Sequence, residues 1–267
     1  MKSAAEVSGS ARMWGRLWGA RADDWAANEE RQLPTYEEAI REVGIEGGER
    51  VLDIGCGTGV FLRLAADQGA AVWGIDAAEA LIELAAARVP EASLRVGEMQ
   101  SLPYEDDTFD VVNGFNSFFF AQDMVASLRE AGRVAKPGGR VVIQVWGPPE
   151  RNDLEAMKEI ARELMPAPSP DAPKPPPLWR PGVLEALAEE AGLQPERAFD
   201  LRYAFEYVDS ETLGRLMLAP AGIGEIAGPD READVRRQIT EALASRRQAD
   251  GSYRLDNDFH FLVATAR

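Results

Sequence analysis

A glycine-rich turn between an apolar run and a helix-like segment has the residue types needed to hold a small polar ligand. The turn is Gly55–Gly59, and it follows Arg50–Ile54. Glycine permits positive φ and leaves no Cβ in the way of an approaching ligand. The start of the next helix offers N–H groups without intrahelical partners. We therefore predict a ligand site lined by Gly55, Cys56, Gly57, Thr58 and Gly59.

Two further features could contact the same ligand. Asp76 ends the second apolar run, 21 positions after Gly55. A carboxylate there can accept hydrogen bonds from both hydroxyls of a ribose. Gly97, Glu98 and Met99 follow the third run, where an adenine could lie. Ligands of open α/β sheets bind at the carboxyl ends of the strands, so these features are expected to meet there.

The elements that would position these residues alternate regularly. Strands are predicted at Arg50–Ile54, Ala71–Ile75, Ser93–Val96, Phe109–Val112 and Arg140–Trp146. Helices are predicted at Val60–Asp67, Ala78–Arg88 and Met124–Val134, and a turn at Lys136–Gly139. Short apolar strands alternating with helices indicate a parallel sheet that is covered on both faces.

The segments outside this core are less regular. The first 45 residues hold Trp14, Trp18 and Trp25 at helical spacing. Pro34 is expected to end this helical stretch, and a separate helix is predicted at 36–43. After the fifth strand we predict a polar helix at 153–164, an extended proline-dense stretch and a helix at 182–191. For the rest of the chain we predict a strand at 203–208, two helices within 210–248 and a final strand at 259–264. The chain thus divides into a helical lid (1–45), a core (46–147), a Pro-rich insertion (148–181) and a completion of the core (182–267) with a helical cap insertion at about 210–250.

Composition excludes several classes of function. Lys and Arg number 29 against 45 Asp and Glu, a net charge of −16, which disfavours nucleic acid and anionic membranes as partners. One cysteine and one histidine exclude an internal disulfide and a Cys/His zinc site, and we expect no metal. His260 lies between Phe259 and Phe261 in a predicted strand and is expected to be structural. No apolar run approaches a membrane span or a signal peptide, so we expect a cytoplasmic protein.

The glycine turn and the segments that follow the other strands resemble the motifs of class I S-adenosylmethionine (SAM)-dependent methyltransferases. The string Asp53–Gly59, DIGCGTG, resembles motif I of that family. Gly74–Asp76 resembles its ribose-binding strand end, and Gly97–Tyr104 its adenine-lining segment, with Glu98 where members often carry Asp. Phe109–Phe115 and Leu128–Gly139 resemble the segments around strands four and five. A nicotinamide fingerprint would instead need a glycine at Val60.

The resemblance implies an α/β fold with a Rossmann-like seven-stranded mixed sheet, order 3-2-1-4-5-7-6, helices on both faces and a small helical cap. It also implies roles. Asp53 would order the glycine turn and approach the SAM amino group, Asp76 would bind the ribose, and Phe115 would border the cofactor. Ala77 would pack on the adenine face, and Glu98 and Met99 would lie at its edge. In the lid, Trp25 would cover the cofactor and Arg21 would pair with its carboxylate.

The expected activity is methyl transfer from SAM to a small molecule, leaving S-adenosylhomocysteine. Cap residues suggest an apolar or aromatic acceptor: Leu178, Trp179, Leu216, Met217, Leu218 and Ile223. Phe118–Phe120 with Trp146 either wall the acceptor pocket or pack in the core. We assign no catalytic residue. A SAM-binding protein that does not methylate and an NAD-dependent oxidoreductase stay open as alternatives, as does the choice between monomer and homodimer.

Overall fold

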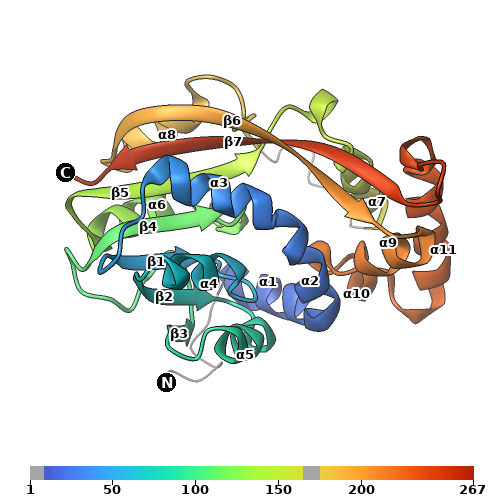
Figure 1. Cartoon of the computed structure of the whole chain (residues 1–267), viewed down its shortest axis with the longest axis horizontal. Coiled ribbons are helices and arrows are strands. Elements are labelled where there is room, and N and C mark those ends of the chain that lie inside the picture. Colours follow the sequence, from blue (N-terminus) through green and yellow to red (C-terminus); the bar gives the residue numbers. More distant parts are fainter. Residues whose placement is uncertain (1–8, 165–174) are drawn as a thin grey trace.

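The computed structural model describes residues 9–164 and 175–267, and its centre is one seven-stranded sheet (Figure 1). The strand order is β3-β2-β1-β4-β5-β7-β6, which confirms the expected topology. Five strands are parallel: β1 (Arg50–Ile54), β2 (Ala71–Asp76), β3 (Ser93–Val96), β4 (Phe109–Phe115) and β5 (Ala135–Trp146). The last strand, β7 (Tyr253–Thr265), runs antiparallel to β5 and to β6 (Gln194–Tyr207).

The last two strands are much longer than predicted. Their pairing runs from Gln194 opposite Thr265 to Tyr207 opposite Tyr253. The first half of β6 carries charged residues, because an edge strand can leave one side in water. It therefore lacks the apolar pattern from which strands were predicted. The pair reaches beyond the other strands towards the cap helices (Figure 1).

Helices cover both faces of the sheet, as expected. On one face, α3 (Leu33–Val43) and α4 (Val60–Asp67) contribute Ile40, Phe61 and Leu62 to a buried cluster that continues under the cap. On the other face, α6 (Met124–Val134) and α8 (Val183–Glu190) contribute Leu128 and Leu184 to a second cluster. Helix α5 (Glu79–Arg88) lies against β2 and β3.

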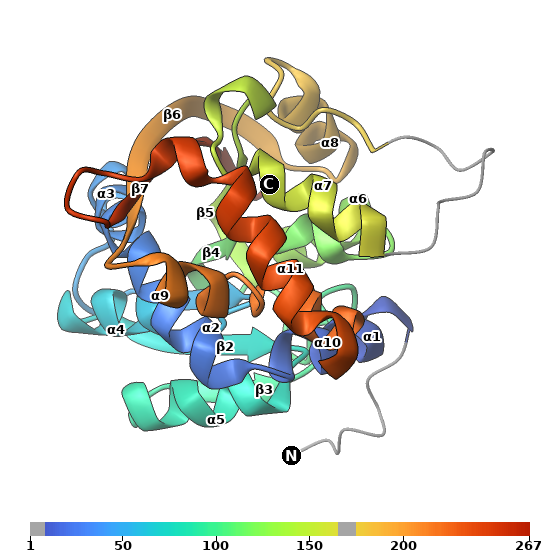
Figure 2. The ribbon, with the colours of Figure 1, turned by 90° about the vertical axis from the view of Figure 1, so that its right-hand side faces the viewer.

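A cap of six helices gathers over the carboxyl edge of the sheet. Its members are α1 (Gly9–Gly19), α2 (Ala22–Glu29), α7 (Glu155–Leu164), α9 (Ser210–Leu216), α10 (Ile223–Ala227) and α11 (Pro229–Ala242). Helix α1 contacts α10, α2 contacts α9, and α7 contacts α11, so helices from before and after the central strands meet in the cap (Figure 2). This arrangement places the N-terminal helices over the strand ends.

Three local predictions were wrong. Pro34 does not break the lid, because the chain stays helical from α2 through the 3-10 turn η2 (Glu30–Gln32) into α3, where Pro34 occupies the first turn and needs no N–H. Residues 136–139 belong to β5, with an irregular register against β4 and a positive φ at Gly138, rather than to a separate turn. The region 210–248 holds three α-helices rather than two. Most of the proline-dense stretch lies outside the described residues.

Across residues 9–164 and 175–267, we find no helix whose length and hydropathy would let it cross a membrane.

Candidate active site

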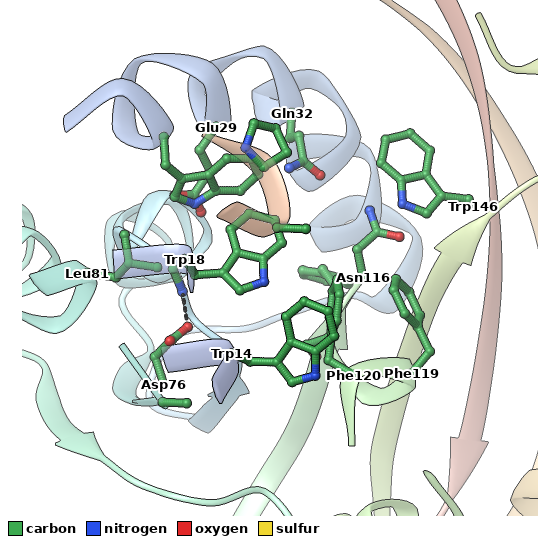
Figure 3. Close-up of a pocket in the computed structure, with 18 of the residues that line it drawn as sticks. Trp14, Trp18, Glu29, Gln32, Asp76, Leu81, Asn116, Phe119, Phe120 and Trp146 are labelled. Carbon is green, nitrogen blue, oxygen red and sulfur yellow. Dashed lines mark hydrogen bonds between the residues drawn. The ribbon is translucent and has the colours of Figure 1, made fainter. Parts of the chain in front are cut away.

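A cavity of about 400 Å³ lies at the carboxyl edge of the sheet, beneath the cap. It is lined by the residues that end or follow the central strands: Gly55 after β1, Asp76 on β2, Phe115 on β4 and Trp146 on β5. Asp76 lies on one side of the cavity and Trp146 on the other (Figure 3). The strand ends therefore converge on one elongated site, as the motif spacing predicted.

The glycine turn needs glycine for reasons of conformation and of space. Gly55, Gly57 and Gly59 have φ values of 76°, 52° and 78°, a region that favours glycine. A Cβ on Gly57 would lie 2.8 Å from Oε1 of Glu29, which is closer than atoms pack. Gly55 and Gly57 line the cavity, whereas Cys56, Thr58 and Gly59 do not.

Asp76 fixes the turn as well as facing the cavity. Its Oδ2 accepts a hydrogen bond of 3.0 Å from the Gly57 amide (Figure 3). Its Oδ1 accepts one of 2.8 Å from the Ala78 amide at the start of α5. Burial raises the pKa of Asp76 to about 6, although these hydrogen bonds oppose the rise. A carboxylate oxygen has two lone pairs, so each oxygen can still accept a ligand hydroxyl.

A second buried carboxyl group faces the cavity from the lid and was not predicted. Glu29 ends α2 and is 3% exposed. Its Oε2 accepts hydrogen bonds from the Thr58 amide at 2.9 Å and from the Thr58 hydroxyl at 2.7 Å. Burial raises the pKa of Glu29 to about 7, while Thr58 and Arg88 oppose the rise. No sequence motif marks Glu29, because only the folding of the lid onto the glycine turn brings it there.

Asp53 lies behind the turn rather than in the cavity wall. It is buried, and its Oδ1 accepts a hydrogen bond of 2.6 Å from Asn113 on β4. Burial, followed by the nearby Glu29 and Asp76, raises its pKa well above the ordinary range. Three carboxyl groups are thus close together, and a positive charge bound in the cavity would favour their ionised forms.

Aromatic side chains of the lid cover the cavity. Trp14, Trp18 and Trp25 all line it, and the rings of Trp18 and Trp25 meet edge to face at 4.6 Å between centroids. Trp14 packs in the same way on Phe120 at 4.7 Å. Arg21, in contrast, is not a cavity residue, because its guanidinium pairs with Glu232 of α11 at 2.5 Å. The expected contact between Arg21 and a SAM carboxylate has no support in this geometry.

Of the remaining residues predicted for the cofactor, Ala77, Glu98, Met99 and Phe115 line the cavity. Cys56 is buried, and burial raises the pKa of its thiol well above the ordinary range, so a nucleophilic role is disfavoured.

His260 lies outside the cavity, on β7. Its Nδ1 lies 2.7 Å from Oδ1 of Asp200 on the neighbouring strand β6. It is not among the residues that line the cavity, and its neighbours Phe259 and Phe261 belong to the cluster on the opposite face of the sheet. The alternation along the strand therefore separates the histidine from the site.

The predicted acceptor residues divide between the cavity and the core. Phe119, Phe120 and Trp146 line the cavity, whereas Phe118 is fully buried in the cluster under α6. Met217 and Ile223 also line it, but Leu178, Trp179, Leu216 and Leu218 do not. Sequence reasoning missed several further lining residues: Asn28, Gln32, Tyr36, Leu81, Asn116, Asn152, Met157 and Phe205.

Comparison with known proteins decides the family. Residues 52–143 match the methyltransferase domain family. A protein of Mycobacterium tuberculosis is 30% identical over 251 residues, which cover 89% of this chain and 88% of that one. The chain belongs to the class I SAM-dependent methyltransferases.

Two further similar proteins are an enzyme whose name gives its reaction and a methyltransferase of known structure. The 27-O-demethylrifamycin SV methyltransferase of Amycolatopsis mediterranei is 29% identical over 204 residues, covering 70% of this chain and 71% of that one. The methyltransferase chain in a complex with the Haloferax volcanii Trm112 methyltransferase activator superposes with a TM-score of 0.60 at 23% identity, over 94% of this chain and 97% of that one. The latter likeness concerns the fold.

Proposed function

We propose that this methyltransferase binds SAM at the Asp76 side of the cavity and transfers its methyl group to a small apolar or aromatic molecule at the Trp146 side. The observation that carries the proposal is that one cavity joins the two sides, with buried acids at one and aromatic side chains at the other. The methyl donor and its acceptor would then meet within a single cavity.

The residues at the Asp76 side fit the chemistry of SAM. Asp76 would accept hydrogen bonds from the ribose hydroxyls, and Ala77, Leu81 and Met99 supply apolar surface for the adenine. Gly55, Gly57 and Phe115 would border the methionine part through their backbones. Glu29 stands beside the turn, where a carboxylate would stabilise the cationic part of the cofactor.

SAM, when bound, supplies a methyl group activated by its positively charged sulfur. The protein would then hold the acceptor in line with that methyl group and exclude water, which lowers the entropic part of the barrier. Trp14, Trp18 and Phe120 close the cavity from the lid side. An acceptor that is already a good nucleophile needs no base, and we assign none.

The shape and lining of the other half support an apolar or aromatic acceptor. Phe119, Trp146, Met157 and Phe205 line it with aromatic rings and a flexible thioether. The Amycolatopsis relative, whose name describes methylation of an oxygen of a rifamycin, shares most of its length with this chain. A small-molecule acceptor of this kind agrees with both observations.

Calorimetry with SAM, S-adenosylhomocysteine and NAD tests the cofactor half of the proposal. We expect binding of the first two and not of NAD, and a loss of at least tenfold in affinity for Asp76→Ala, because two charge-assisted hydrogen bonds are removed. Affinity for NAD alone, or an Asp76→Ala variant that binds SAM normally, would contradict it.

Labelled SAM and a panel of acceptors test the second half. We expect transfer of the labelled methyl group to neutral aromatic or apolar compounds and not to highly charged ones. If the protein binds SAM tightly but methylates nothing across the panel, a SAM-binding protein without methylating activity becomes the better description.

A further inference from the structure

Two amide side chains at the acceptor side of the cavity have polar atoms without protein partners. Gln32 ends η2 in the lid, and Asn116 follows β4. Both line the cavity, although they lie 84 positions apart in the sequence. Figure 3 shows Gln32, Asn116 and Trp146 together on the side away from Asp76. The two amides therefore belong to the acceptor half rather than to the ribose end.

The burial of these amides makes their free atoms costly. Gln32 is 6% exposed, and its Oε1 is buried with no hydrogen-bond partner in the described protein. Oδ1 and Nδ2 of Asn116 are likewise buried and unpartnered. A buried polar atom left unpaired costs about 1–3 kcal/mol. Because both residues line one cavity, a ligand group bound there can complete the missing hydrogen bonds.

The backbone of Asn116 gives an independent indication. Its φ is 51°, in the left-handed region that residues other than glycine seldom occupy. The conformation is held by a hydrogen bond of 3.0 Å from the Asn116 amide to the Gln144 carbonyl of β5. Asparagine tolerates this conformation better than most residues that carry a side chain, and the conformation sets the direction of the Asn116 amide. Here it places an amide beside the aromatic wall of the cavity.

The charges around the cavity limit what the amides can bind. The charged side chains that line it are Glu29, Asp76, Glu98, Glu155 and Lys158. Lys158 is paired with Glu155, with 2.8 Å between Nζ and Oε2. Because acids outnumber the single, already paired cation, an anionic acceptor would meet net repulsion. A neutral group that both donates and accepts hydrogen bonds matches the amides best, and a hydroxyl group does both.

We propose that Gln32 and Asn116 determine acceptor specificity by hydrogen bonding a neutral hydroxyl group of an aromatic acceptor whose ring lies against Trp146 and Phe119. The hydroxyl donates to one amide oxygen and accepts from the Asn116 amide nitrogen. This inference rests on the proposed function, because it assumes that SAM occupies the Asp76 side.

The test compares two probes that differ by one hydroxyl group. The protein is saturated with S-adenosylhomocysteine, and calorimetry then measures its affinity for 2-naphthol and for naphthalene. We expect the wild-type protein to prefer 2-naphthol by about tenfold or more, since each neutral hydrogen bond contributes about fivefold. Gln32→Met with Asn116→Gly should reduce the preference to about twofold or less. Asn116→Gly keeps the positive φ and removes only the amide, so this variant should fold.

Asn152 provides a matched control. It also lines the cavity, but its Nδ2 donates to the Pro148 carbonyl and its Oδ1 accepts from the Asp258 amide. Asn152→Ala should therefore keep the preference for 2-naphthol.

The remaining outcomes overturn the proposal in distinguishable ways. If S-adenosylhomocysteine binds but the wild-type protein binds neither probe, or binds both equally, the amides do not select a hydroxyl. If the double variant loses affinity for S-adenosylhomocysteine and keeps the preference, the amides serve the cofactor. If S-adenosylhomocysteine does not bind at all, the proposed function fails together with this inference.

Discussion

Glu29 should make the stability of the protein depend on pH, and Glu29→Gln should remove that dependence. In the folded protein burial raises the pKa of Glu29 from its ordinary value of 4.5 to about 7. A raised folded-state pKa stabilises the folded protein fully below the unfolded value, and the contribution is lost as the pH rises through the folded value. The folded protein is therefore expected to lose stability between about pH 4.5 and pH 7, because in this range the carboxyl group ionises in the unfolded chain but stays protonated in the folded protein.

The magnitude follows from the two pKa values. The full difference between 4.5 and about 7 corresponds to about 3 kcal/mol, of which roughly 1 kcal/mol is already lost at pH 5. The free energy of unfolding of Glu29→Gln, minus that of the wild-type protein, should thus grow by about 2 kcal/mol between pH 5 and pH 8. The glutamine can still accept the hydrogen bonds from Thr58, so the packing of the lid is retained.

The assay is urea denaturation of both proteins at pH 5, 6, 7 and 8 without ligand. Asp53, Asp76 and Arg88 also act on Glu29 or titrate nearby, but they are present in both proteins. Glu83→Gln, at an exposed position on α5, is the matched control and should give no pH-dependent difference. The reasoning is refuted if the difference between Glu29→Gln and wild type stays constant over this range.

Three further predictions test other parts of the site. Gly57→Ala should lose at least tenfold in affinity for SAM, measured by calorimetry, and about 1–3 kcal/mol of stability, measured by denaturation. The reason is that the new Cβ would contact the Glu29 carboxyl group and that alanine would have to adopt a positive φ. Normal SAM binding by this variant would contradict the close approach. Phe118→Ala should cost about 3–5 kcal/mol in denaturation experiments, whereas Phe119→Ala should cost much less and instead change the KM for the acceptor, since only Phe119 faces the cavity. Arg21→Ala should change SAM affinity by less than about twofold and stability by up to about 1 kcal/mol, because its ion pair is with α11; a large loss of SAM affinity would restore the role first expected for Arg21.

The sequence alone was sufficient to predict most strands of the sheet and the residues next to the glycine turn. The strands β1 and β3 and the helices α4 and α6 lie where their patterns placed them. Short buried strands and amphipathic helices have strong periodicity, so local sequence predicts them well. The turn Gly55–Gly59 directly follows β1 and Asp76 ends β2, so the motifs could be recognised in the sequence, and the family that they resemble implied the strand order.

Only the tertiary structure decided which residues outside the core reach the cavity. Glu29, Gln32 and Asn116 carry no motif, and Arg21, which precedes the first residue of α2, pairs with Glu232 of α11 instead. The six cap helices come from distant parts of the chain, and their relative placement depends on side-chain packing that no local pattern encodes. Likewise Phe118 and Phe119 are identical neighbours in sequence, yet one is buried in the core and the other lines the cavity. The physical reason is that both residues lie in the 3-10 turn η3 (Phe118–Phe120) after β4, and the orientation of that turn is fixed only when the surrounding elements pack against it.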